Sequence, residues 1–177
     1  PPPNWAFVKA DQGGGPVYAM AELPKDPSTI SSSVCFGMPS MPPEFWREDI
    51  ARAKATMSDG QMLIVSVVAS PEPGWSATQV ADDYAQCAAW AAEAGADAVE
   101  ANYSCPNVCS AEGQVYRDPP LSSTITQTIR TAIGEVPLLL KIGVFPDADS
   151  QRAFLHAVAD NATGITLVNG ISRPVLH

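Results

Sequence analysis

Positive charge is scarce in this chain. Of its 177 residues, 10 are lysine or arginine and 19 are aspartate or glutamate, which gives a formal net charge of −9. An acidic chain without a basic run is poorly suited to nucleic-acid backbones and anionic membrane surfaces. We therefore expect neither nucleic acid nor a membrane as a partner.

Long apolar runs are also lacking. None approaches the ~20 residues that span a bilayer, and no basic segment followed by an apolar one opens the chain. Hydrophobic residues still make up 46% of the sequence, enough for one globular core. We expect a cytoplasmic chain whose ends are truncations, since it begins with Pro1 rather than methionine.

Metal-ligand patterns are missing as well. The two histidines show no ligand spacing, and Cys105 and Cys109, four residues apart without a nearby histidine, are weak evidence for zinc. We expect no metal and reduced cysteines, with Cys87 packing in a helix. Glycines 13–15 follow no expected strand, so they are no dinucleotide fingerprint.

From residue 60 onward, short apolar segments alternate with segments of helical length. Ser76 and Gln79 have the spacing of a capping box, and Gly95 marks the end of that helix. Successive βα units of a parallel sheet fit this alternation. The expected strands are 62–68, 97–101, 137–142 and 164–168, and the expected helices are 77–93, 122–133 and 149–159.

An upstream unit is also expected, with a strand at 33–36 and a helix at 42–55, which makes about five βα units. Residues 1–30 hold much of the proline and glycine and are expected as an irregular arm. We expect one domain over 1–177, with the βα units in 31–177. An open doubly wound sheet and a (β/α)8 barrel both satisfy this alternation.

The most informative segment is Asn102-Tyr103-Ser104-Cys105-Pro106-Asn107. It sets a cysteine between two asparagines where the expected strand 97–101 ends, and Pro106 prevents regular structure from continuing. Loops at the carboxyl ends of parallel strands carry the reactive groups of α/β enzymes. This pattern predicts a reactive loop.

That segment, followed by Leu140-Lys141-Ile142 and by Val168-Asn169, resembles the active-site series of class 1 dihydroorotate dehydrogenases, cytosolic flavoenzymes of pyrimidine synthesis. Membrane-bound class 2 members carry serine where this chain has Cys105. The resemblance spans about 33–174 and implies a (β/α)8 TIM barrel. Because a complete barrel needs about 250 residues, the chain is expected to be its central portion, with exposed sheet edges.

The resemblance implies FMN-dependent oxidation of dihydroorotate to orotate, in which a base removes a proton and a hydride passes to FMN. Cys105 matches the family's base, and its thiol needs nearby donors or a cation to ionise near neutral pH. A buried inert thiol is the alternative. Ser104 is expected to relay the proton, or else to be a turn hydroxyl.

Binding roles follow from the same resemblance. The asparagines offer both donors and acceptors to a pyrimidine ring, although asparagines beside proline are also common in turns. Lys141, at the end of an apolar strand, suits an anionic flavin. The alternative is that its ammonium simply reaches solvent. The implied substrate residues are Asn102, Asn107, Asn169, Gly37 and Met38, and the implied FMN residues are Lys141, Asn102, Val168 and Ser66.

Two positions depart from the family pattern. Val34 stands where asparagine is usual, and Gly170 where serine is frequent. These departures leave open a related flavoprotein acting on another dihydropyrimidine. A non-catalytic fragment is also open, because the phosphate-binding loops of the barrel are missing. The residues 116–118 are expected in a mobile covering loop or as solvated loop residues.

The resemblance leaves the oxidant open between fumarate and NAD. NAD-using relatives work with an iron–sulfur electron-transfer subunit, for which the sequence gives no support. A homodimer is expected by analogy only.

Overall fold

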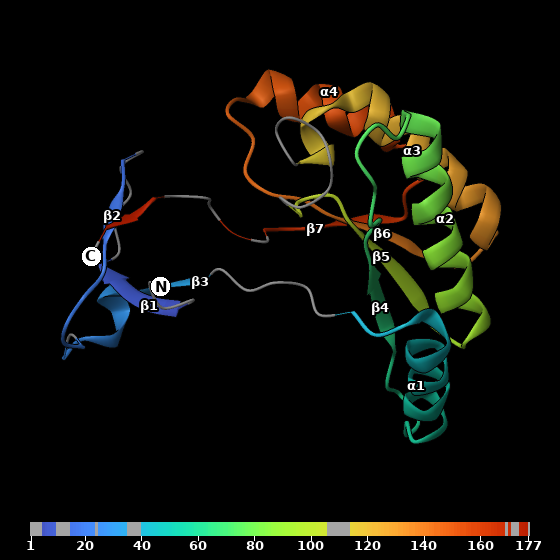
Figure 1. Ribbon diagram of the computed structural model, residues 1–177, viewed down its shortest axis with the longest axis horizontal. Coiled ribbons are helices and arrows are strands. Elements are labelled where there is room, and N and C mark those ends of the chain that lie inside the picture. Colours follow the sequence, from blue (N-terminus) through green and yellow to red (C-terminus); the bar gives the residue numbers. More distant parts are fainter. Residues whose placement is uncertain are drawn as a thin grey trace. The chain divides into compact units, whose positions relative to one another are not determined.

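The structure, a computed structural model, describes residues 5–9, 15–23, 25–34, 40–105, 114–168, 170 and 174–176. The chain divides into two compact units. The larger unit is Met41–Gly170, and the smaller one combines Pro1–Ser40 with Ile171–His177. Figure 1 shows the elements of both units.

A four-stranded parallel sheet forms the centre of the larger unit. Its strands lie in chain order, β4-β5-β6-β7. The strands are β4 (Ile64–Val67), β5 (Ala98–Asn102), β6 (Leu138–Lys141) and β7 (Gly164–Thr166); the helices are α1 (Pro43–Ala55), α2 (Ala77–Glu93), α3 (Pro119–Ile133) and α4 (Ala148–Val158), with a 3-10 turn η2 (Val115–Arg117) before α3.

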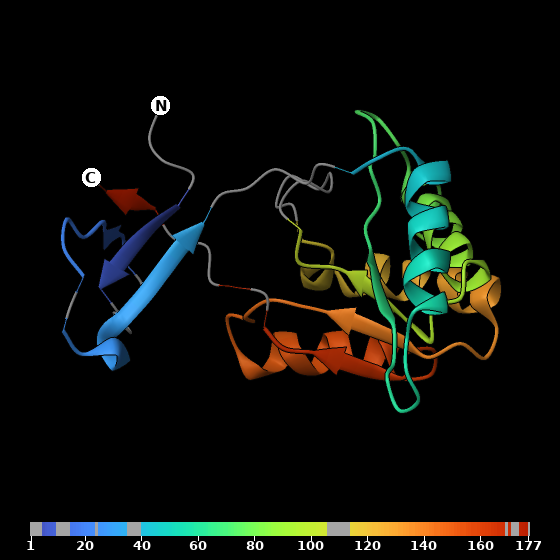
Figure 2. The same cartoon turned by 90° about the horizontal axis from the view of Figure 1, so that it is seen from below.

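The order of the strands distinguishes a barrel from a doubly wound sheet. Crossovers between parallel strands are right-handed, so strands that always advance in one direction keep their helices on one face. Figures 1 and 2 show α2, α3 and α4 gathered on one side of the sheet. A doubly wound sheet would reverse its order and carry helices on both faces. The expected α/β fold is thereby confirmed, and the arrangement is that of part of a (β/α)8 barrel.

Local sequence signals account for the helix boundaries. The capping box at the start of α2 is present: Gln79 N donates to Ser76 Oγ at 3.3 Å, and Ser76 N donates to Gln79 Oε1 at 2.9 Å. Gly95 follows this helix with a φ of +107°, a conformation that suits glycine. The helix α3 begins three residues earlier than predicted, because Asp118 caps it.

The core of the larger unit lies between the sheet and its helices. Val99, Leu138 and Leu140 alternate along their strands and are fully buried against α2 and α3. Cys87 packs against this core as predicted, and burial raises the pKa of its thiol to about 11. None of the helices that the structure describes is long and apolar enough to cross a membrane.

The smaller unit contains strands where the sequence indicated an irregular arm. The strand β1 (Trp5–Lys9) pairs antiparallel with β3 (Ile30–Val34), and β2 (Val17–Tyr18) pairs parallel with β8 (Val175–Leu176). A 3-10 turn η1 (Pro27–Thr29) precedes β3. The strand expected at 33–36 was therefore misplaced as part of the parallel sheet, whose described strands number four rather than five.

Candidate functional site

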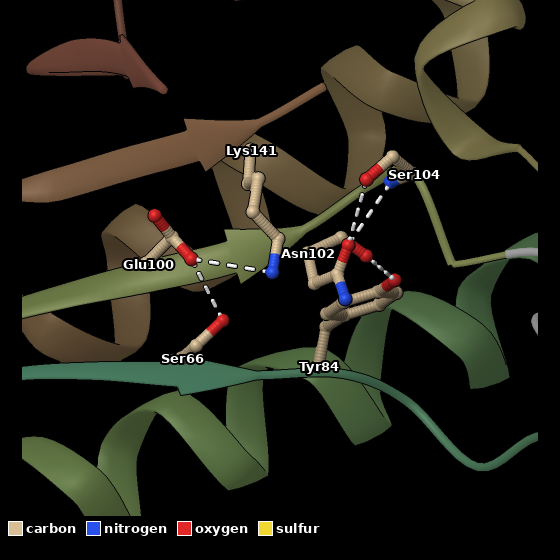
Figure 3. Close-up of polar contacts among 6 residues, drawn as sticks. All are labelled: Ser66, Tyr84, Glu100, Asn102, Ser104 and Lys141. Carbon is tan, nitrogen blue, oxygen red and sulfur yellow. Dashed lines mark hydrogen bonds and ion pairs between the residues drawn. The ribbon is translucent and has the colours of Figure 1, made fainter. Parts of the chain in front are cut away.

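Polar side chains gather on the sheet face opposite the helices, here called the inner face. It carries Ser66 on β4, Glu100 and Asn102 on β5, and Lys141 on β6 (Figure 3). Ser66 pairs in register with Glu100, and Asn102 pairs with Lys141. Because residues in register share a face, these side chains from three strands meet near the carboxyl ends of the sheet.

Glu100 is a site residue that the sequence interpretation missed. Its Oε1 accepts a hydrogen bond of 2.8 Å from Ser66 Oγ and lies 3.6 Å from Lys141 Nζ. The side chain of Glu100 is 13% exposed and that of Lys141 is 23% exposed. The sequence signal for Glu100 was a carboxylate inside an otherwise apolar strand. Acidic side chains are rarely buried there unless a charged or hydrogen-bonding side chain pairs with them.

Lys141 was predicted at the end of an apolar strand, facing either a flavin or solvent. The structure places it as the last residue of β6, with its ammonium paired to Glu100 rather than simply extended into water. Its carbonyl oxygen accepts a hydrogen bond of 2.9 Å from Tyr103 N, so the chain beyond β5 stays attached to β6. The position of the lysine is therefore fixed by its backbone and its side chain.

Asn102 and Ser104 form a small turn at the start of the predicted reactive loop. Asn102 Oδ1 accepts hydrogen bonds from Ser104 N at 3.2 Å and Ser104 Oγ at 3.0 Å (Figure 3). Both residues are buried. This side-chain turn is typical of asparagine, which can mimic a backbone turn. The hydroxyl of Ser104 thus bonds to the asparagine that was predicted to contact substrate and cofactor.

Two buried tyrosines support this turn from the helix side. Tyr84 Oη donates to the carbonyl oxygen of Asn102 at 2.9 Å, and Tyr103 shares a 2.8 Å hydrogen bond with Thr126. Burial raises the pKa of Tyr84 well above its ordinary value, and nearby Tyr103 and Cys105 raise it further. Tyr84 therefore stays protonated and keeps its hydrogen-bond donor.

Cys105 follows the turn directly and is 3% exposed. It packs with the core residues at the carboxyl end of β5, among them Tyr103 and Tyr84. Such burial shields the sulfur from bulk solvent. A function for Cys105 in proton removal stays a prediction.

Residues 116–118, predicted in a covering loop, belong to η2 and to the N-terminal cap of α3. Val115 and Tyr116 are buried, and Asp118 caps α3. Tyr116 Oη donates to the carbonyl oxygen of Val144 at 3.0 Å, and Tyr116 N donates to that of Tyr103 at 3.3 Å. The solvated interpretation was wrong for Tyr116, because its ring is buried against Gly143. The mobile interpretation stays a prediction.

The structure does not bring every predicted residue to the inner face. Val168 lies just after β7 and is 51% exposed. Among the residues that the structure describes, no cluster of three or more histidine, cysteine or acidic side chains offers a metal site. The predicted substrate residues Asn107, Asn169, Gly37 and Met38 lie outside the described residues.

No family model matches this chain. It is 34% identical over 172 residues to the dihydroorotate dehydrogenase of Dictyostelium discoideum, a match that covers 96% of this chain and 45% of that protein. It is 32% identical over 94 residues to the dihydroorotate dehydrogenase B (NAD(+)) catalytic subunit of Staphylococcus carnosus, covering 52% and 30% of the two chains.

Two further similarities are weaker. A putative dihydroorotate dehydrogenase A (fumarate) of Aeropyrum pernix is 24% identical over 129 residues, which cover 71% of this chain and 38% of that protein. A crystal structure of dihydrodipicolinate synthase from Bacillus clausii gives a TM-score of 0.46 at 16% identity, covering 73% and 38%. The chain spans less than half the length of each of the three curated relatives.

Proposed function

We propose, on the premise that this chain is a homologue of the dihydroorotate dehydrogenases, that it forms part of an FMN-dependent enzyme that oxidises dihydroorotate to orotate. The observation that carries the proposal is the pairing of Asn102 with Lys141 on adjacent strands, next to the turn that leads into Cys105. These residues match the family's active-site series, and their positions at the carboxyl ends of parallel strands are those of a barrel active site.

The described residues suit a flavin. The distance of 3.6 Å between Lys141 Nζ and Glu100 Oε1 is longer than a hydrogen bond, so the ion pair leaves ammonium donors for another acceptor. Asn102 uses its Oδ1 for Ser104 and presents its amide nitrogen as a donor. FMN, when bound, accepts the two electrons and one hydrogen of the oxidation.

Ser66, Asn102 and Lys141 would hold that cofactor from three neighbouring strands, with Val168 against it. The positive charge of Lys141 suits the pyrimidine edge of the isoalloxazine, where negative charge gathers on reduction. Because the strands fix the backbone of all three inner-face residues, the cofactor meets groups that are already in place.

Cys105 would act as the base, taking the proton from C5 of dihydroorotate on its Sγ. The turn between Asn102 and Ser104, held by Tyr84, sets where the cysteine leaves the strand. Ser104 would pass the proton onward to water. Asn102, Asn107 and Asn169 would orient the pyrimidine, and the backbone at Gly37 and Met38 would bind its carboxylate.

A related dihydropyrimidine is the second candidate substrate. Val34 has no hydrogen-bonding side chain where the family usually has asparagine, and Gly170 lacks the hydroxyl of the frequent serine. Both changes remove contacts to the substrate and leave the residues proposed for the flavin intact.

The proposal is tested with the complete protein that carries this sequence, whose visible spectrum is recorded before and after anaerobic addition of dihydroorotate or dihydrouracil. We expect yellow protein that dihydroorotate bleaches. Bleaching should be far slower in the Cys105→Ser variant, with Cys87→Ser as the matched control. Bleaching by dihydrouracil alone would favour the second candidate. Colourless protein would refute a flavin enzyme and favour a non-catalytic fragment.

A further inference from the structure

Glu100 lies at the centre of the inner face. It is the third of five residues in β5, and its side chain reaches neighbours on both adjacent strands (Figure 3). On one side Ser66 of β4 donates a hydrogen bond, and on the other the ammonium of Lys141 forms an ion pair. The proposed reaction assigns no function to this carboxylate.

Both contacts converge on one oxygen atom. Ser66 Oγ lies 2.8 Å from Glu100 Oε1, and Lys141 Nζ lies 3.6 Å from the same atom. The serine therefore fixes the orientation of the carboxylate, and the carboxylate in turn restrains the lysine. Since a lysine side chain has many rotamers of similar energy, this restraint decides where its charge is placed.

We infer that Glu100 is a positioning residue, which holds the Lys141 ammonium on the inner face and partly offsets its charge toward the bound flavin. The inference rests on the proposed function, because it assigns Lys141 to the flavin. The 3.6 Å separation suits this purpose: the ion pair directs the ammonium without occupying all its donors.

Charge balance gives the direction of the effect. A negative charge beside Lys141 weakens the positive potential that the flavin meets, and at low dielectric such a charge acts over several ångströms. Reduction adds electrons to the flavin, so less negative charge nearby favours the reduced state. Removing the charge of Glu100 should therefore raise the midpoint potential.

The first experiment measures Lys141 without the flavin. Apoprotein of the complete protein is labelled with a limiting amount of acetic anhydride at one fixed pH, and modification of each lysine is quantified by peptide mass spectrometry. In Glu100→Gln we expect several-fold faster labelling of Lys141, with Lys54, which binds Asp97 at 2.5 Å, as the internal reference. An unchanged ratio between the two lysines would overturn positioning by Glu100.

The second experiment measures the flavin midpoint potential in the holoprotein. Glu100→Gln should shift the equilibrium between oxidised and reduced flavin about tenfold toward reduced, or about 30 mV for a two-electron couple. Glu100→Asp keeps the charge and should stay near the wild-type value, and exposed Glu135→Gln is the charge-matched control. Equal midpoint potentials in wild type and Glu100→Gln would overturn the inferred effect of the Glu100 charge on the flavin.

The two experiments separate the two proposals. If the wild-type protein binds no flavin, the proposed function fails, and the lysine labelling still tests Glu100. If flavin binds and dihydroorotate bleaches it, an unchanged potential counts against Glu100 alone. Should Glu100→Gln fold poorly by circular dichroism, Ser66→Ala replaces it: this variant frees the carboxylate, and Lys141 labelling should rise in the same direction.

Discussion

The two faces of the β4–β7 sheet are built from the same strands and differ in almost every property. Toward the helices, Val99 and Leu140 are fully buried and make up the core. On the inner face, Glu100 and Lys141 form a network with Ser66. Because side chains alternate along a strand, one short segment contributes every second residue to the core and the others to the proposed site. A substitution should thus affect folding or activity according to the face it alters.

Cys105→Ser should have the largest effect, and it should be an effect on rate. A hydroxyl is a much weaker acid than a thiol, so loss of the base should slow flavin bleaching by dihydroorotate by about 10²–10⁴-fold. Serine fits the space of the cysteine, so the loss of unfolding free energy should be no more than the cost of a buried hydroxyl, about 1–3 kcal/mol. Rapid-mixing absorbance in the complete protein measures the rate. A bleaching rate equal to that of Cys87→Ser would exclude Cys105 as the base.

Leu140 and Lys141 are neighbours on β6 that test the two faces directly. Leu140→Ala empties a fully buried position and should cost about 2–5 kcal/mol of unfolding free energy. Lys141→Ala should cost less stability and weaken flavin binding about 10–100-fold, as expected when a charged hydrogen-bond donor is lost. Urea unfolding and flavin titration of the complete protein measure both. Equal losses of unfolding free energy in Leu140→Ala and Lys141→Ala would contradict the distinction between the core face and the inner face.

Much of the larger unit could be predicted because its signals are local. The apolar run before Asn102 indicated β5, and the serine and glutamine at positions 76 and 79 indicated the start of α2, since a capping box needs only neighbouring residues. The reactive loop, inferred from Pro106 and the polar residues around it, stays a prediction. The family resemblance then selected the barrel, which alternation alone did not.

The missed features depend on contacts between distant segments. Glu100 gains its importance from Ser66 and Lys141, which lie on the two neighbouring strands, and nothing within β5 indicates either partner. The strand β1 was missed because its partner β3 comes after a proline- and glycine-rich stretch, and strand pairing is weakly specified by local propensity. The burial of Tyr116 was missed because the space for its ring is created by Gly143, which lies beyond β6 in the chain.

Gly143→Ala should lower stability moderately, because Tyr116 bonds to the segments that follow β5 and β6. A Cβ at this position would lie 2.6 Å from Tyr116 Oη, so the tyrosine would have to move. Overpacking of this kind costs about 1–3 kcal/mol. The double variant with Tyr116→Phe removes the closest contact and should recover part of that loss in thermal unfolding. Additive losses in the double variant would show that the two residues do not interact.

The smallest effect concerns the other cysteine and appears only at high pH. Burial raises the pKa of Cys87 from 9.0 to about 11, so the folded state disfavours its thiolate. A group whose pKa is raised on folding contributes stability below its unfolded pKa and loses it as the pH rises further. Stability should therefore fall between about pH 9 and pH 11, and Cys87→Ala should flatten that part of the profile. Urea midpoints at several pH values test this, and a profile that Cys87→Ala leaves unchanged would assign the slope to other groups. If both predictions hold, the two cysteines have different effects: Cys87→Ala changes stability at high pH, and Cys105→Ser changes the rate of flavin bleaching.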